Sequence, residues 1–413
     1  MNPPASIILM VALAPLACGT ERDAIAVASA RDSAGIAIVE SAEPRWGGDG
    51  GWRLSSDPAV RIGALEDNPV YELYQVSNAV RLSDGRIVVA NSGTHELRFY
   101  DEAGTFLMKV GRQGGGPGEF EMLFTIRALA GDSVMAYDAN HRRISIFDPQ
   151  ARFVRDLAIG NAEQVLFALP HGRLPDGSYL VESPSRQPGP AMLDRPTGRQ
   201  RDSIVVLRLD ATGGILDTMG IFPGLAMQIT TVKMGDRGFP MPLAVPFSPR
   251  TTISLGSDRT YVGTSDTYEI RMFDVRGTLT RIVRRPHENR PVTDRDVATT
   301  RERMDAGLAQ QSNPFSAQLR DVYRDIEYPE TMPAYGMVIG DREGNLWVSE
   351  TGAPDRDEAR WTVFDRDGAM LGTVAIPREL RVTEIGATYV LGTMSDDLEI
   401  ESVLLYNLIK PRT

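Results

Sequence analysis

Six polar residues recur at one position of a repeated sequence pattern. Each of them follows, by four residues, the apolar or aromatic residue that opens a predicted β-strand. The six are Asn91, Asp138, Ser183, Ser265, Glu350 and Thr393. A short polar side chain at the end of a strand can accept hydrogen bonds from the backbone N–H groups of the adjoining turn. The same oxygens, gathered at one end of six neighbouring strands, could instead bind a ligand or coordinate Ca²⁺.

Other side chains with catalytic potential form no known motif. The four histidines are His95, His141, His171 and His287. None lies in an H-E-x-x-H or i, i+4 pair, so a zinc-binding helix is not indicated. No G-x-S-x-G is present, so a nucleophile elbow is not indicated either. The basic residues Arg284, Arg285 and Arg290 lie near His287, and this cluster fits either a solvated turn or a site for an anion.

The composition excludes some classes of function. The chain has 413 residues, of which 42% are apolar and 24% are charged, as in soluble globular proteins. Its formal net charge of −11 argues against nucleic-acid binding, which uses a basic surface to replace phosphate counterions. The sequence has one cysteine, so neither a disulfide framework nor a cysteine-based zinc site can form within the chain.

That cysteine, Cys18, ends the apolar stretch ASIILMVALAPLACGT. The stretch is too short to span a bilayer, which takes about 20 residues. It is typical of a signal peptide, and its end resembles the lipobox of bacterial lipoproteins, although Pro15 stands where leucine is usual and MNPPAS lacks Lys and Arg. The resemblance implies cleavage before Cys18 and transfer of a diacylglycerol to its thiol. The alternative is an ordinary signal peptide with a chance cysteine.

From this we expect a signal peptide over 1–17 and a flexible, lipid-anchored tether over 18–34. The resemblance then implies a place in the bacterial cell envelope, at the outer membrane or on the periplasmic face, with the lipid holding the protein to the membrane. Gly19, in place of aspartate after the cysteine, fits sorting to the outer membrane in that family.

A strand-rich pattern occurs six times in the remaining chain. The clearest copies are DGRIVVANSGTHELRFYDEAGTFLMKVG at 84–111 and DSVMAYDANHRRISIFDPQARFVRDLAIG at 132–160. Later copies cover 176–220, 258–283, 343–376 and, in degenerate form, 387–407. Runs such as LRFYD, ISIFD and IRMFD alternate apolar and polar residues as half-buried strands do. Small antiparallel sheets of this kind bury their faces by stacking around an axis.

These repeats resemble the six-bladed β-propeller family related to the NHL repeat, over about residues 57 to 408. The run GRQGGGPGEF at 111–120 is similar to one that follows the first full blade in that family. It should cross from the outer strand of one blade to the inner strand of the next. A phosphate-binding loop is not indicated, because Glu119 and Phe120 follow its last glycine in place of Lys-Ser or Lys-Thr.

The predicted fold class is therefore all-β, a six-bladed β-propeller of four-stranded antiparallel blades that spans 35–413. An open ring would leave sheet edges unpaired. We expect the orphan strand 57–65 to pair with the last blade and close the ring, and the run 35–41 fits a further strand.

Three insertions interrupt the repeats, at 184–202, 221–250 and 287–332. The second is rich in proline and aromatic residues and reads as irregular but apolar. The third predicts a small helical insertion, because Thr293 and Asp296 are spaced as an N-cap and its partner. Its second helix should present the apolar stripe Phe315, Leu319, Val322 and Ile326, with Arg320 and Arg324 facing outward. We expect this stripe to dock on the ring, at least two insertions to narrow the channel mouth, and Asp138 and Glu350 to wall a pocket beneath them.

The sequence favours a non-enzymatic binding or scaffold propeller outside the cytoplasm, whose partner is an unknown protein or small molecule. The alternative is a hydrolase at the channel mouth that depends on a metal of the Ca²⁺ type. Propeller lactonases and gluconolactonases, which look similar, use such a metal, but no ligand set can be matched to residues of this sequence. We therefore expect no cofactor, with Ca²⁺ as the candidate if one is bound.

Overall fold

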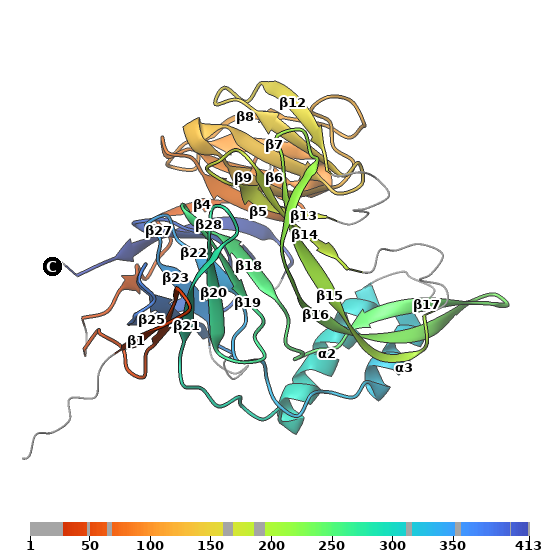
Figure 1. Ribbon diagram of the computed structural model, residues 1–413. Helices are drawn as coiled ribbons and strands as arrows, with labels where there is room; N and C mark the ends of the chain where they lie inside the picture. The colour runs from red at the N-terminus through yellow and green to blue at the C-terminus, as the bar shows by residue number, and fades with distance from the viewer. Residues whose placement is uncertain are drawn as a thin grey trace, which may run out of the picture.

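The protein was analysed as a computed structural model that describes residues 28–47, 50–63, 68–159, 168–185, 195–310, 316–351, 357–396 and 398–411. The predicted signal peptide 1–17 and Cys18 lie outside these residues. The described strands form six sheets arranged around a centre (Figure 1). Neither helix of the described residues is long and apolar enough to cross a membrane.

The six sheets are the blades, and each begins with its innermost strand. The bounds of blades 1 and 2 are β5 (Val76–Arg81), β6 (Ile87–Asn91), β7 (Glu96–Tyr100), β8 (Phe106–Val110), β9 (Leu123–Ala128), β10 (Val134–Asp138), β11 (Arg143–Phe147) and β12 (Phe153–Ala158). Those of blade 3 are β13 (Leu169–Arg173), β14 (Tyr179–Pro184), β15 (Gly198–Leu209), β16 (Ile215–Met234) and β17 (Arg237–Ala244). Short 3₁₀ turns occur at Ser92–Thr94 and Ala130–Asp132.

Blades 4 to 6 follow in the same order along the chain. Their bounds are β18 (Thr252–Leu255), β19 (Arg259–Gly263), β20 (Glu269–Asp274), β21 (Leu279–Arg284), β22 (Val338–Gly340), β23 (Leu346–Ser349), β24 (Glu358–Phe364), β25 (Met370–Pro377), β26 (Arg381–Ile385), β27 (Tyr389–Ser395) and β28 (Glu401–Ile409). The four strands that precede blade 1 are β1 (Ser29–Ser33), β2 (Ile36–Glu40), β3 (Arg53–Leu54) and β4 (Val60–Ile62).

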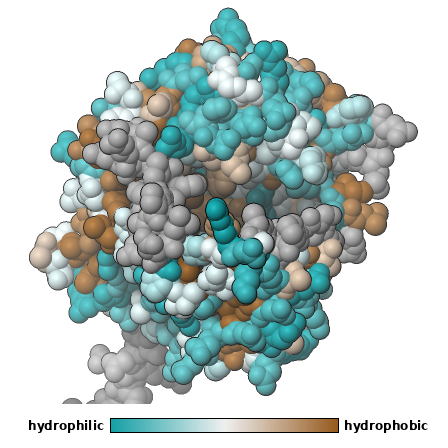
Figure 2. Space-filling model, turned by 90° about the vertical axis from the view of Figure 1, so that its right-hand side faces the viewer, coloured by the Kyte–Doolittle hydropathy of each residue, from teal (hydrophilic) through white to brown (hydrophobic). Residues whose placement is uncertain are grey.

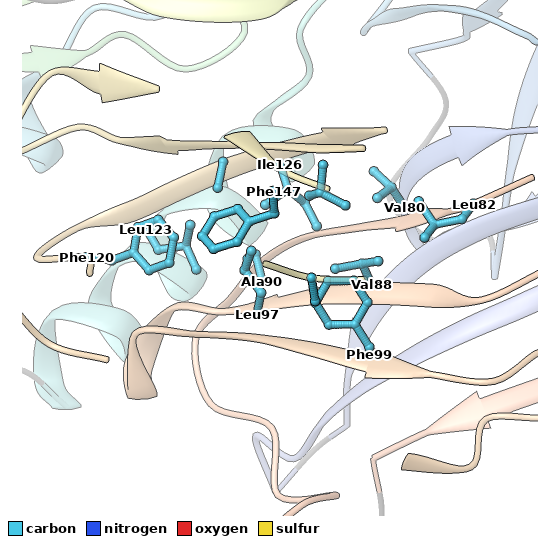
Figure 3. Packing of buried hydrophobic residues seen from close by; sticks show 13 residues of the cluster. Val80, Leu82, Val88, Ala90, Leu97, Phe99, Phe120, Leu123, Ile126 and Phe147 are labelled. Carbon is cyan, nitrogen blue, oxygen red and sulfur yellow. The ribbon is translucent and has the colours of Figure 1, made fainter. Parts of the chain in front are cut away.

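A separate apolar cluster fills each of the six junctions between neighbouring blades. Between blades 1 and 2, for example, Val88 and Leu97 pack against Phe120 and Ile126 (Figure 3). Equivalent clusters join blades 2 and 3, 3 and 4, 4 and 5, 5 and 6, and 6 and 1. Each sheet therefore buries both of its faces, and the predicted six-bladed β-propeller is confirmed.

The repeated aromatic–aspartate pairs have a clear structural reason. The aromatic residue is the last buried position of the third strand, as with Tyr100 and Phe147. The aspartate that follows accepts hydrogen bonds from the amides two and four residues later, so Asp148 binds the N–H groups of Gln150 and Arg152. Aspartates 101, 210, 274 and 365 make the same bonds in their own turns. These side-chain contacts fix the hairpin between the third and fourth strands.

The ring closes as the sequence predicts. Val60 and Ile62 of β4 pair with Leu405 and Val403 of β28, and β3 pairs with the end of the same strand. An N-terminal strand thus completes blade 6. The crossing at 111–120 joins β8 to β9, which confirms its predicted place between blades 1 and 2.

The described residues of 36–62, which are 36–47 and 50–62, lie along the outer edges of several blades, and we call them the N-terminal strap. Its β2 pairs in parallel with β21, the outer strand of blade 4. On blade 5 the amides of Arg45 and Trp46 donate to the carbonyls of Met370 and Leu371 at 3.1 and 2.7 Å. The Trp46 ring lies so close to Gly372 that a Cβ there would come within 2.2 Å of it. The strap therefore covers the outer edges of blades 4, 5 and 6.

The predicted tether 18–34 overlaps this region. Residues 29–33 form β1, which pairs with β2 in a hairpin and is exposed along its whole length. The paired backbone contradicts a flexible tether at 29–33. Residues 18–27 lie outside the described part of the chain.

The insertion at 221–250 is a β-hairpin and not the irregular segment that its prolines suggest. Residues 227–234 of β16 pair with β17. Pro240 and Pro242 lie in β17, which is the last strand of its sheet. Proline is tolerated in an edge strand, because one side of that strand has no neighbour to receive its N–H.

The predicted helical insertion is confirmed. Helix α2 (Asp294–Gln310) begins after Thr293, whose hydroxyl accepts the amide of Asp296, and the Asp296 carboxylate accepts the amide of Thr293 in return. Helix α3 (Ser316–Asp325) follows, and Phe315 lies just outside the described residues. Hydrogen bonds from Arg290 and Thr293 hold the pKa of Asp296 well below its usual range, although burial opposes this.

Candidate functional site

The six polar residues of the repeat mostly tie strands of their own blades together. Oδ1 of Asn91 accepts the amide of Tyr74 at 2.7 Å, just before inner strand β5. Oγ of Ser265 accepts the amide of Arg250 at 3.0 Å, just before inner strand β18. In both blades the end of the second strand is thus fastened to the segment that leads into the innermost strand.

Asp138 makes the most extensive of these ties. Its carboxylate is fully buried and accepts the amides of Glu121, Asn140 and His141 at 2.7, 2.9 and 3.0 Å. The His141 ring lies 3.0 Å from the same carboxylate through Nδ1. Burial alone would raise the pKa of Asp138, but the hydrogen bonds from His141 and Glu121 outweigh it and hold the pKa below its usual value.

In blade 5 the tie falls on a different residue from the predicted one. Oγ of Ser349 accepts the amide of Met337 at 2.8 Å, so Ser349 and not Glu350 is equivalent to Asn91 and Ser265. Glu350 instead accepts hydrogen bonds from Arg285 and Thr362 at 3.1 and 2.9 Å. The repeat alignment is therefore wrong by one residue here, because the apolar opening of β23 gives no sign of this shift.

The last two residues have other surroundings. Ser183 is buried in β14, opposite Val205 of β15. Oγ1 of Thr393 accepts Nε of Arg381 at 2.9 Å. None of the six lines either of the two cavities described below.

The contacts of Asn91, Asp138 and Ser265 agree with the interpretation that polar side chains at strand ends accept hydrogen bonds from nearby backbone N–H groups. Among the described residues no three His, Cys, Asp or Glu side chains lie together as a metal site would require. That Ca²⁺ or a ligand binds directly to the six residues stays an untested prediction.

A cavity of about 520 Å³ lies at the start of the inner strands of blades 1, 2 and 6, and we call it the mouth cavity. Among its lining residues are Ser77, His95, Glu121, Met122, Phe124 and Arg381. The innermost strands surround the axis of a propeller, so this cavity lies at one mouth of the central channel. Figure 2 looks onto the side that carries the hairpin and the helices and shows it hollowed near its middle.

Arg381 is the fixed cation of the mouth cavity. Its Nε donates to Thr393, and its Nη2 donates to the carbonyl of Val76 at 2.5 Å. Both partners are neutral oxygens. Within the described residues no carboxylate lies at ion-pair distance from this guanidinium. The positive charge is therefore held in place without being neutralised.

Two buried polar atoms of the mouth cavity lack a hydrogen-bond partner among the described residues. They are Oγ of Ser77 and Nδ1 of His95. Ser77 is the extra residue of a β-bulge in β5, since Val76 pairs with Asn91 and Asn78 with Ala90. Bulges often re-aim a side chain beside a functional site. A buried polar group without a partner costs about 1–3 kcal/mol, so both atoms suit contact with a ligand.

Apolar side chains form the third component of the mouth cavity, besides the Arg381 cation and the two unpartnered polar atoms. Met122 is 54% exposed and Phe124 is 44% exposed, at the start of the innermost strand β9 of blade 2. Sequence reasoning missed this wall because the apolar residues Leu123 and Phe124 read as one strand start. Two consecutive apolar residues give no signal of this exposure, because a strand with both faces buried is apolar at successive positions.

Two of the six repeat residues hold lining residues of the mouth cavity in place. Thr393 fixes Arg381, and Asp138 holds the amide of Glu121. Asp138 and Thr393 therefore position the cavity wall from behind without lining the cavity. The prediction that Asp138 and Glu350 themselves wall a pocket is not supported, since Asp138 is buried and Glu350 pairs with Arg285.

A second cavity of about 530 Å³ lies at blade 4 and contains the predicted basic cluster. Its lining includes Arg284, Arg285, His287 and Glu269. Arg284 pairs with Glu269 at 2.8 Å and Arg285 with Glu350 at 3.1 Å, while Arg290 outside the lining pairs with Asp296 at 2.8 Å. Burial and the charge of Arg285 lower the pKa of His287 and favour its neutral form. The cluster is thus made of structural ion pairs, which weakens the case for an anion there.

The second and third insertions contact each other, but the helices dock on the hairpin and not on the ring. No described residue of the three insertions lines the mouth cavity, so the predicted narrowing of the channel mouth is not supported. Leu319 of α3 packs in a cluster with Leu308 of α2 and with Val232 and Leu243 of the β16–β17 hairpin. The side-chain amide of Gln318 also exchanges two hydrogen bonds with the backbone of Lys233. In Figure 1 this hairpin–helix unit projects to the lower right, beyond blade 3. The apolar stripe therefore joins two insertions, since the hairpin offers it an apolar face.

The outward-facing arginines of that stripe are only partly as expected. Arg324 is exposed and pairs with Asp321 at 3.2 Å. Arg320 is half-buried, and its Nε is covered. Ile326 is buried beyond the end of α3, in agreement with its place in the stripe.

Comparisons with known proteins agree with this architecture. Residues 64–161 match the model of a family described as a 6-bladed beta-propeller. No curated protein matches the chain. A member of the DUF4221 family from Bacteroides vulgatus is similar over 88% of this chain and 100% of its own, with a TM-score of 0.51 at 11% identity. An exported-protein candidate from Bacteroides fragilis covers 91% of this chain and 100% of its own, with a TM-score of 0.48 at 13% identity. The chain is a six-bladed β-propeller.

Proposed function

We propose that the protein is a lipid-anchored binding propeller of the bacterial cell envelope, which takes its ligand in the mouth cavity. The observation that carries the binding role is the set of Arg381, Ser77 and His95 around one cavity. In the described part of the chain it combines a charge that no carboxylate neutralises with two buried polar atoms that have no hydrogen-bond partner. A volume of about 520 Å³ falls within the usual range of small-molecule sites, roughly 300–1,000 Å³.

The position of the mouth cavity supports binding over a structural role. Its wall comes from blades 1, 2 and 6, which meet only when the ring is closed. Ser77 and Phe124 lie on inner strands that are held on both sides by neighbouring sheets. A rigid scaffold that presents side chains from several elements at one point is the usual setting of a binding site.

Filling the cavity should abolish binding. Ser77→Phe places an aromatic ring where the bulge presents a hydroxyl, and we expect every fragment that binds the unaltered protein at the mouth cavity to lose its signal in ligand-observed NMR. Leu216→Phe, on the exposed outer edge of blade 3, is the matched control and should keep those signals. Fragments that bind equally well to the Ser77→Phe protein would show that the mouth cavity is not the binding site.

The membrane anchor is the second part of the proposal and rests on the LACG sequence that ends at Gly19. Expression in a diderm bacterium with labelled palmitate should give a labelled protein in the membrane fraction. Cys18→Ala should remove both the label and the membrane association. A Cys18→Ala protein that keeps either one would contradict lipidation at this residue.

A further inference from the structure

We propose that the ligand of the mouth cavity is a small organic acid, bound by its carboxylate at Arg381 with its apolar body against Met122 and Phe124. This inference rests on the proposed binding function and specifies its chemical class. It follows from the charge, the neutral donors and the apolar wall of one cavity.

The guanidinium of Arg381 supplies the positive charge that a carboxylate would meet. Its hydrogen-bond partners differ from those of the arginines at blade 4. Arg284, Arg285 and Arg290 each meet a carboxylate, while Arg381 meets the hydroxyl of Thr393 and the carbonyl of Val76. These bonds use Nε and Nη2 and fix the plane of the group. A fixed, planar cation with donors still to be used is suited to a carboxylate, which accepts two such bonds side by side.

The uncharged side chains of Ser77 and His95 also favour a carboxylate ligand. Oγ of Ser77 is a hydroxyl that can donate to a carboxylate oxygen. Nδ1 of His95 can donate or accept, depending on the tautomer. Both atoms are buried, so a ligand that replaces their lost water bonds would satisfy two groups at once.

The apolar wall of the cavity determines which body the ligand carries besides its carboxylate. Met122 and Phe124 are both exposed beside these polar groups. Methionine adapts its shape and makes favourable contacts with aromatic rings. An acid with an aromatic or branched apolar body would therefore cover this wall while its carboxylate reaches Arg381.

Glu121 is the carboxylate of this cavity that opposes an anion. Its side chain is exposed, and its backbone amide is held by Asp138. The Arg381 side chain is exposed as well, so solvent screens both charges, and what distinguishes Arg381 is that two hydrogen bonds hold its guanidinium in place. Glu121→Gln should consequently strengthen the binding of an acid, which a neutral ligand would not show.

The test uses the full chain and two probes of equal shape, 3-phenylpropionate and 3-phenylpropionamide, in titration calorimetry. We expect the acid to bind at least about tenfold more tightly than the amide, as loss of a hydrogen-bonded charge pair predicts. Arg381→Gln should remove this preference, Thr393→Val should weaken it because the guanidinium is no longer fixed, and Glu121→Gln should increase it. Arg155→Gln, on the outer strand of blade 2, is the matched arginine control and should change nothing.

The outcomes separate the two proposals. Equal binding of acid and amide, or an acid preference that survives in Arg381→Gln, overturns the carboxylate assignment. Binding of only non-acidic fragments, blocked by Ser77→Phe, also overturns it but supports the binding function. If Arg381→Gln fails to fold, the opposite shifts of Thr393→Val and Glu121→Gln decide the assignment, and the absence of either shift contradicts it.

Discussion

Deletion of residues 19–66 should leave a chain that does not reach a stable fold. The deletion removes the whole N-terminal strap, including its closing strand β4. The apolar side chains lost with it are Val39, Val60, Ile62, Trp46 and Trp52. Burial of the three aliphatic side chains contributes roughly 4–9 kcal/mol, and the partly buried Trp46 and Trp52 add to it, which together is comparable with the whole stability of a typical domain, about 5–15 kcal/mol. Thermal melting followed by circular dichroism should show no cooperative transition.

A shorter deletion is the control for this result. Removal of residues 19–33 takes away β1, whose side chains are exposed, and leaves every strand that pairs with blades 4 to 6. Its melting temperature should stay close to that of the full chain. Closure by the N-terminal strands would be contradicted by two deletions that melt alike.

Asp138→Ala should be the most damaging single substitution among the six repeat residues. It leaves the amides of Glu121, Asn140 and His141 without their acceptor in a buried place. At about 1–3 kcal/mol for each donor left unsatisfied, the three donors together predict a loss of roughly 3–9 kcal/mol in the free energy of unfolding. Urea denaturation measures this loss directly.

The matched control is Asp148→Ala. Asp148 also accepts two backbone amides, but its turn is exposed and water can take its place. The midpoint in urea should move far less than for Asp138→Ala. Equal shifts would show that burial of the carboxylate is not what makes Asp138 important.

Most of the ring could be predicted from the sequence because its signals are local. Alternating runs such as ISIFD determine strands, and the aspartate that ends each run determines the next turn. Strand 57–65 was identifiable as the closing strand because it is apolar, alternates and belongs to no repeat. These features depend on neighbours within a few residues, where sequence patterns are most reliable.

The mouth cavity could not be predicted because it depends on contacts between distant segments. Arg381 and Val76 are joined by a hydrogen bond across about three quarters of the chain. Nothing near Arg381 in the sequence distinguishes it from arginines that meet a carboxylate. The bulge that sets Ser77 apart is likewise a property of strand pairing, and the hairpin under α3 was concealed by prolines that its edge position tolerates.

Because the N-terminal strap covers some outer strands and leaves others uncovered, the blades differ in how readily they can pair with strands of other molecules. The outer strands of blades 4 to 6 have their hydrogen-bonding edges occupied by residues of the same chain. The outer strands β8 and β12 are the last of their sheets, and Leu107 and Val154 on them are 48% and 55% exposed. Unpaired strand edges are where foreign strands add and where fibres start. Blades 1 and 2 therefore offer openings for such growth, and β17 at blade 3 and the exposed β1 outside blade 4 are likewise the last strands of their sheets.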